Sequence, residues 1–222
     1  MISEFINRFL ETGKMVVSAL TVRRDTSTID SVVALERFVS SRAAFVTQKK
    51  LYGYLKTRMG TKWPTVFADD VYRQSINIAA AQIFAASLSD LTIHAVATAL
   101  EGDSISNETK TAIARRIYAH GIAENEAVNS AHGLDSAVAI AEFEKRLTGT
   151  DWNFGALMAE NFNRSPVALL KWSPIAEELK KFDGEIVENS MKFAWIDVRR
   201  DFAARLDAPA IVREVQAQGQ VD

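Results

Sequence analysis

Hydrophobic residues recur along most of the chain at the three- and four-residue spacing of α-helices. Glycine and proline are scarce, at 10 and 4 of 222 residues, so little interrupts this pattern. The pattern predicts an all-α protein, a multi-helix bundle with long antiparallel helices. We expect an amphipathic N-terminal helix within residues 1–26 and a single helical-bundle domain over residues 27–222. The N-terminal helix can pack on the bundle or make transient contact with a membrane surface, and the sequence leaves both open.

Two long helices are expected in the first half of the chain. One covers about residues 28–59 and ends before Gly60. The other covers about residues 69–100 and begins with two acids, which suit the positive end of the helix dipole. Residues 76–100 are long enough to cross a membrane, but they contain Asp90, which is costly inside a bilayer. We therefore expect a buried core helix.

Shorter helices are expected next in the chain. One covers residues 108–119, with Gly121 as its terminator, and another covers residues 135–147, with Asp135 as its N-cap. Residues 151–163 show only a weak helical pattern. The boundaries in this region rest on single capping residues.

The last helix has the strongest start signals, because Ser173 is a candidate N-cap and Pro174 occupies the first helical position. We expect it to continue to about Leu206. Its apolar positions alternate by four and three, which is typical of a coiled coil or bundle. This self-association seam contains Phe182, Ile186, Asn189, Phe193, Ile196 and Arg200. Two interpretations stay open: a core helix whose polar positions reach solvent, or a helix through which two copies associate.

The charge of the chain is unevenly distributed. Residues 37–68 contain seven basic residues and no acid, whereas the whole chain has 26 Lys and Arg against 28 Asp and Glu. Within the first long helix, the cations project between two apolar rows, which favours an anion-binding or partner-binding surface. Its candidate residues are Arg42, Lys49, Lys50, Lys56, Arg58 and Lys62. The alternative is that their stems extend past the apolar rows and their charges pair with acids of the last helix.

Residues 43–58, AAFVTQKKLYGYLKTR, contain a Leu-Tyr-x-Tyr pattern followed by a basic residue. This segment resembles the recognition-helix region of TetR-type repressors, although Phe45 stands where that motif has its turn glycine. The resemblance implies a dimeric, all-α regulator that binds nucleic acid. The residues expected to face DNA are Thr47, Lys50, Tyr52, Tyr54 and Lys56.

Residues 51–60, together with residues 75–79, are similar to an uncharacterised bacterial all-α family whose members sometimes carry an esterase label. The sequence contains no G-x-S-x-G, H-E-x-x-H or di-iron motif, so we expect a protein that is not an enzyme. Asp90 and His94 are spaced by four residues, which makes them a candidate polar core pair or a small-ligand site. We expect no metal and no cofactor.

These observations favour a non-enzymatic interaction or regulatory protein. It would bind an acidic partner surface through the basic helix and associate with itself, as a homodimer. The absence of cysteine fits the reducing cytoplasm. The alternatives are the TetR-like regulator and a helical protein that binds a small ligand or a metal.

Overall fold

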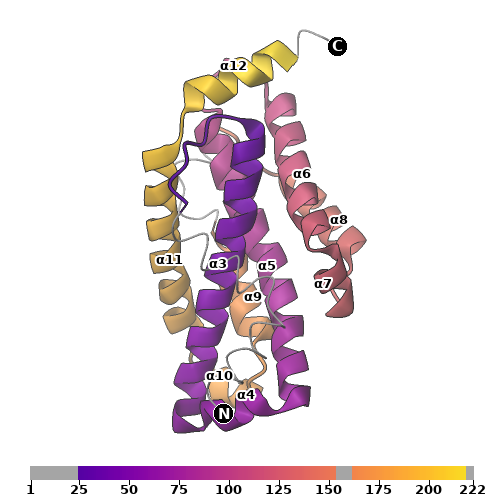
Figure 1. Cartoon of the computed structure of the whole chain (residues 1–222), viewed down its shortest axis with the longest axis vertical. Coiled ribbons are helices and arrows are strands. Elements are labelled where there is room, and N and C mark those ends of the chain that lie inside the picture. The colour runs from indigo at the N-terminus through magenta and orange to yellow at the C-terminus, as the bar shows by residue number, and fades with distance from the viewer. Residues whose placement is uncertain (1–24, 154–161, 219–222) are drawn as a thin grey trace.

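The computed structural model describes residues 25–153 and 162–218 (Figure 1). The expected N-terminal helix and most of residues 151–163 therefore lie outside the described residues. Helices dominate the described part of the chain, in which the one β-type contact is an isolated bridge between Ile29 and Leu206. The helical elements are α3 (Val32–Met59), η1 (Gly60–Lys62), α4 (Trp63–Ala68), α5 (Asp70–Ala99), α6 (Asn107–Glu124), α7 (Glu126–Ala131), α8 (Ser136–Thr148), α9 (Arg164–Trp172), α10 (Glu177–Lys180), α11 (Gly184–Arg205) and α12 (Ala208–Gln218).

The predicted all-α bundle is confirmed. The two long helices α3 and α5 pack along each other at its centre (Figure 1). On one side α9 and α11 pack against them, and on the other side lie α6 and α8, while α12 crosses one end. Nearly all of the C-terminal two thirds of α5 is buried, because neighbours surround it. This explains why its sequence is apolar around its whole circumference.

Local sequence signals account for the ends of the two central helices. The Ser31 hydroxyl accepts a hydrogen bond from the Ala34 N–H and caps α3, and the Asp69 carboxylate accepts one from the Tyr72 N–H and caps α5. Gly60 ends α3 with a φ of 55°, a left-handed value that favours glycine. The predicted boundaries of both helices are thus close to the observed ones.

Among the described residues, α5 is the one helix that is long and apolar enough to cross a membrane. Of its most apolar window, 78% is buried inside the protein. The helix also carries Asp90, which is fully buried against other parts of the chain. Both observations fit the expected core helix.

The predicted long last helix is wrong in its first ten residues. Ser173 does not start a helix: it follows the end of α9, and its hydroxyl donates to the Leu169 carbonyl at 2.6 Å. The buried Lys180 ammonium then donates to the carbonyls of Leu170, Lys171 and Ser173. A helix end exposes carbonyls that need donors, so this lysine holds α10 against the end of α9 and keeps the chain in the turn between them.

Two of the shorter helices test capping signals. Asp135 caps α8 as predicted, because its carboxylate accepts hydrogen bonds from the Ala137 and Val138 N–H groups. The prediction that Gly121 ends α6 is wrong, since α6 continues to Glu124. A Cβ at this glycine would lie 2.8 Å from a methyl carbon of Leu88. Gly121 therefore permits the close approach of α6 to α5.

Candidate functional site

Some basic residues of α3 contact α11 or the residue that precedes it. The Arg42 guanidinium lies 2.6 Å from the Asp201 carboxylate, and the Arg58 guanidinium lies 3.1 Å from the Asp183 carboxylate. The Lys50 ammonium donates to the Ser190 hydroxyl at 3.0 Å. Three of the six candidate partner-binding cations thus contact residues of this chain, as the alternative interpretation expects.

The surroundings of these contacts shift the pKa values of two side chains of α3, Lys50 and Tyr54. Burial and the neighbouring Lys49 charge lower the pKa of Lys50, and Asp197 opposes this effect. Burial raises the pKa of Tyr54, and its hydrogen bond to the Asp183 carboxylate raises it further. The α3–α11 contact is therefore an electrostatic interface within the chain.

The other three candidate cations point outward. Lys49, Lys56 and Lys62 are exposed, and none has an ion pair with another described residue. The Lys49 ammonium lies 5.6 Å from the centre of the Phe45 ring, and the Lys56 ammonium lies 4.5 Å from that of Trp63. Such cation–π contacts leave the charges accessible to solvent.

The structure does not support a TetR-like recognition helix. A helix-turn-helix requires a turn, but residues 43–58 lie inside the uninterrupted helix α3. Thr47, which would face DNA, is fully buried and hydrogen-bonds the Ser87 hydroxyl at 3.1 Å. The resemblance is therefore confined to a short run of sequence.

The predicted self-association seam lies on the outside of the bundle, although its first member, Phe182, lies in the turn before α11 and not on the helix. We name these residues the outer strip: Phe182, Ile186, Asn189, Phe193, Ile196 and Arg200. The exposed fractions of its hydrophobic members are 83% for Phe182, 68% for Ile186, 68% for Phe193 and 45% for Ile196. The opposite face of α11 is buried, through Val187, Met191, Ala194, Trp195, Val198 and Phe202. The helix is thus apolar on two faces, and only one of them packs in the bundle.

Asp90 and His94 share one helix but do not hydrogen-bond to each other. The Asp90 carboxylate accepts hydrogen bonds from the Arg146 guanidinium at 2.7 Å and from the Ser165 N–H at 2.8 Å. Burial raises the pKa of Asp90, and Arg146 and Ser165 oppose this effect. The interpretation of Asp90 and His94 as a hydrogen-bonded pair is wrong, because Asp90 instead joins α5 to α8 and α9.

His94 packs between aromatic rings, with centroid distances of 5.3 Å to Phe162 and 6.1 Å to Phe202. Its Nδ1 atom is buried and has no hydrogen-bond partner among the described residues. Burial and the charge of Arg199 lower the pKa of His94 to about 4, so the imidazole is neutral at pH 7. The described residues contain no group of three side chains that would suit a metal ion.

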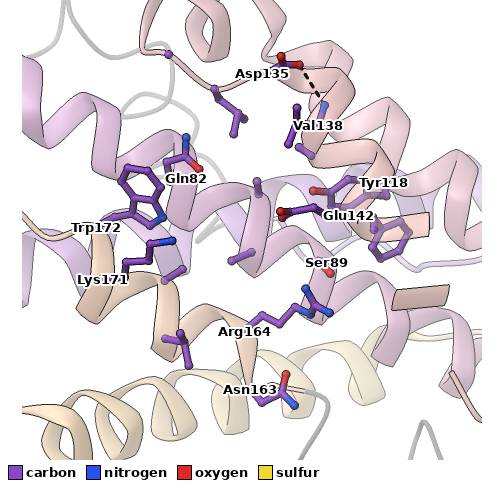
Figure 2. A pocket seen from close by; sticks show the side chains of 18 residues that line it. Gln82, Ser89, Tyr118, Asp135, Val138, Glu142, Asn163, Arg164, Lys171 and Trp172 are labelled. Atoms are coloured by element: carbon purple, nitrogen blue, oxygen red, sulfur yellow. Dashed lines mark hydrogen bonds between the residues drawn. The ribbon is translucent and has the colours of Figure 1, made fainter. Parts of the chain in front are cut away.

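A cavity of about 790 Å³ lies between α5, α6, α8 and α9 (Figure 2). Its polar lining includes Gln82, Tyr118, Glu142, Arg164 and Lys171, and small side chains such as Ala85 and Ala139 leave it room. Sequence analysis missed this cavity. Its residues come from four helices, and the pattern along any one of them does not show which faces converge.

Compared with models of known families, with curated proteins and with solved structures, the chain matches none. The site must therefore be interpreted from its own geometry. Two features of the described residues are the basis for that interpretation: the exposed outer strip and the cavity between α8 and α9.

Proposed function

We propose that this protein is a non-enzymatic interaction protein that forms a homodimer through the outer strip of α11. The exposure of the strip carries the proposal. Ile186, Phe193 and Ile196 lie on one face of α11 and are each between 45% and 68% exposed, and Phe182, in the turn before this helix, is 83% exposed. Burying one such side chain stabilises a complex by about 1.5–3 kcal/mol, so this set favours association.

The charges along the strip favour an antiparallel pair related by a twofold axis. In a parallel pair, Arg200 would face its own symmetry mate, and the two like charges would repel. In an antiparallel pair centred between Asn189 and Phe193, the two Arg200 side chains instead lie at opposite ends of the interface. The acid Glu185 and the base Arg199 lie on the same flank of α11, so this arrangement also brings them together.

Sedimentation velocity over a range of protein concentrations tests the dimer. The Phe193→Glu variant should remain monomeric where the parent chain dimerises, because it places a charge in the strip. Val71→Glu is a matched control, since Val71 is 75% exposed and lies outside the strip. Circular dichroism checks that both variants keep their helices. A parent chain that stays monomeric at every concentration contradicts the proposal.

A competing occupant of the strip is the segment 1–24. The described residues begin at Asp25, whose carboxylate pairs with Arg205 at the end of α11. The same experiment on a chain that lacks residues 1–24 separates the two cases. A dimer that forms only after truncation would show that the segment covers the strip in the full chain, and this would contradict the homodimer proposal.

Cysteine crosslinking tests the direction of the helices, because the natural chain has no cysteine. A mixture of the single variants Glu185→Cys and Arg199→Cys should form a mixed disulfide in an antiparallel dimer. A parallel dimer would instead hold the two positions about 21 Å apart along the helices, so the mixed disulfide would not form. A dimer without this mixed disulfide would contradict the antiparallel arrangement.

A second interaction is favoured by the three outward-facing lysines of the basic segment. We infer that Lys49, Lys56 and Lys62 offer a surface to an acidic protein partner, while Arg42, Lys50 and Arg58 bind to α11. The double variant Lys49→Glu/Lys56→Glu should abolish recovery of that partner in a pull-down. The Lys145→Glu variant, on an exposed face of α8, is the control. Recovery that both variants leave unchanged would contradict this inference.

A further inference from the structure

The cavity between α8 and α9 collects exposed apolar side chains that the bundle does not use. Val138 on α8 is 53% exposed, and Val167 and Trp172 on α9 are 66% and 36% exposed. All three line the same cavity. At about 790 Å³ the cavity is within the size range of small-molecule sites, and a bound molecule would remove these side chains from water.

Charged side chains without ion pairs surround this apolar surface. Arg164 and Glu142 both line the cavity, and neither forms an ion pair with another described residue. They belong to different helices, α9 and α8, and both charges act on the hydroxyl of Tyr118. Asp135 and Lys171 also line the cavity, but among its charged lining residues Arg164 and Glu142 are the two that act on Tyr118.

Tyr118 supplies an unpartnered polar atom at that point. The residue is buried, with 3% of its surface exposed, and its ring stacks on Phe143 with 4.1 Å between the ring centroids. The hydroxyl has no hydrogen bond to any described residue. Figure 2 shows it beside Glu142 and pointing into the cavity. Burial and the Glu142 charge raise the pKa of Tyr118, which keeps the hydroxyl protonated and able to donate.

We propose that this cavity binds a small zwitterion with an apolar body, of the chemical class of the large apolar amino acids. The carboxylate of the ligand pairs with the Arg164 guanidinium and accepts a hydrogen bond from Tyr118. Its ammonium pairs with the Glu142 carboxylate. Its apolar side chain covers Val138, Val167 and the neighbouring alanines.

The two charges favour a zwitterion over simpler ligands of the same size. A plain anion would be repelled by Glu142, and a plain cation would be repelled by Arg164. A neutral apolar molecule would gain nothing from either charge, since both residues are exposed and keep their contacts with water. The site does not include α11, so the proposal is independent of the proposed dimer.

Isothermal titration calorimetry with L-tryptophan, L-phenylalanine and L-leucine tests the proposal. N-acetyl-L-tryptophan lacks the ammonium group and L-tryptophanamide lacks the carboxylate, so they serve as matched probes. We expect at least one of the free amino acids to bind. For tryptophan, we expect each modified form to bind about tenfold or more weakly, because each loses a charge-assisted contact.

Variants of Glu142 and Arg164 test which group of the ligand each side chain binds. Glu142→Gln should weaken binding of the free amino acid and remove its advantage over the N-acetyl form. Arg164→Gln should remove its advantage over the amide, while the backbone N–H of residue 164 can still reach Asp90. Lys145→Gln, on the same helix as Glu142 but outside the cavity, should change nothing. Val138→Trp should block the cavity at an exposed position without disturbing the core.

Each of these titrations has a result that would contradict the proposal. Absence of binding by all three free amino acids at millimolar concentration contradicts it. Equal affinity for the free, N-acetyl and amide forms contradicts the zwitterion. Binding that neither Glu142→Gln nor Arg164→Gln weakens places the ligand elsewhere. Circular dichroism spectra confirm that each variant is folded before its affinity is interpreted.

Discussion

Arg42 of α3 and Asp201 of α11 form an ion pair at 2.6 Å between these two helices. Arg42 belongs to the acid-free basic segment, and Asp201 belongs to the acidic remainder of the chain. Part of the basic segment is therefore neutralised by acids of the same chain. A charge pattern along the chain does not by itself indicate whether the complementary charge lies in a partner or in another helix.

The buried pair of Asp90 and Arg146 should be the most sensitive charged contact in the bundle. Asp90→Ala would leave the largely buried Arg146 without its carboxylate, so we expect a loss of about 3–5 kcal/mol in the free energy of unfolding. Glu144→Ala breaks the exposed pair with Arg115 and should cost about 0–1 kcal/mol. Urea denaturation measures both. Equal losses of unfolding free energy in the two variants would contradict the expectation that the buried ion pair matters more than the exposed one.

Two glycines on helices should respond in opposite ways to substitution by alanine. Gly121→Ala places a Cβ 2.8 Å from Leu88 and should destabilise the protein by about 1–3 kcal/mol. Gly53→Ala meets nothing within 4 Å on α3 and should stabilise it by up to about 1 kcal/mol. Thermal unfolding of both variants checks the signs. A neutral Gly121→Ala variant would show that Leu88 can move aside.

The fold was predictable from sequence because helical periodicity and capping residues act locally. Asp135 and Gly60 sit at the ends that their chemistry predicts. The last helix was not predictable in the same way. Ser173 and Pro174 are residues typical of a helix N-terminus. However, the Lys180 ammonium donates hydrogen bonds to carbonyls at the end of α9, and this contact between two separate helices keeps the chain in a turn instead.

The candidate site shows the same division. The apolar outer strip could be predicted as a row, yet the sequence does not say which of the two apolar faces of α11 packs against the bundle. The cavity could not be predicted at all. Tyr118, Glu142 and Arg164 are far apart in the chain, and only the packing of α6, α8 and α9 brings them together.

The stability of the fold should depend on the protonation of His94. Its folded pKa is about 4, below the ordinary value of 6.5, so between these values the unfolded chain binds more protons. The free energy of unfolding should therefore fall as the pH falls through this window, by about 2 kcal/mol between pH 7 and pH 5. His94→Phe should remove this part of the slope, whereas His120→Gln, at an exposed position, should retain it. Urea denaturation at both pH values tests this, and an unchanged slope in His94→Phe would contradict it.

Lys180 should stabilise the turn between α9 and α11 through its ammonium group. The side chain is 96% buried, since 4% of it is exposed, and it donates to three carbonyls at distances of 2.9–3.4 Å. Lys180→Met keeps the length and apolar stem but leaves these carbonyls without their donor, so we expect a loss of about 2–3 kcal/mol in the free energy of unfolding. Lys181→Met, at the neighbouring exposed position, should change it by less than about 0.5 kcal/mol. Hydrogen exchange should further show faster exchange of the amides in residues 177–183 of the Lys180 variant alone. Equal stability of the two variants would mean that packing of the methylene stem, rather than the ammonium, holds this turn.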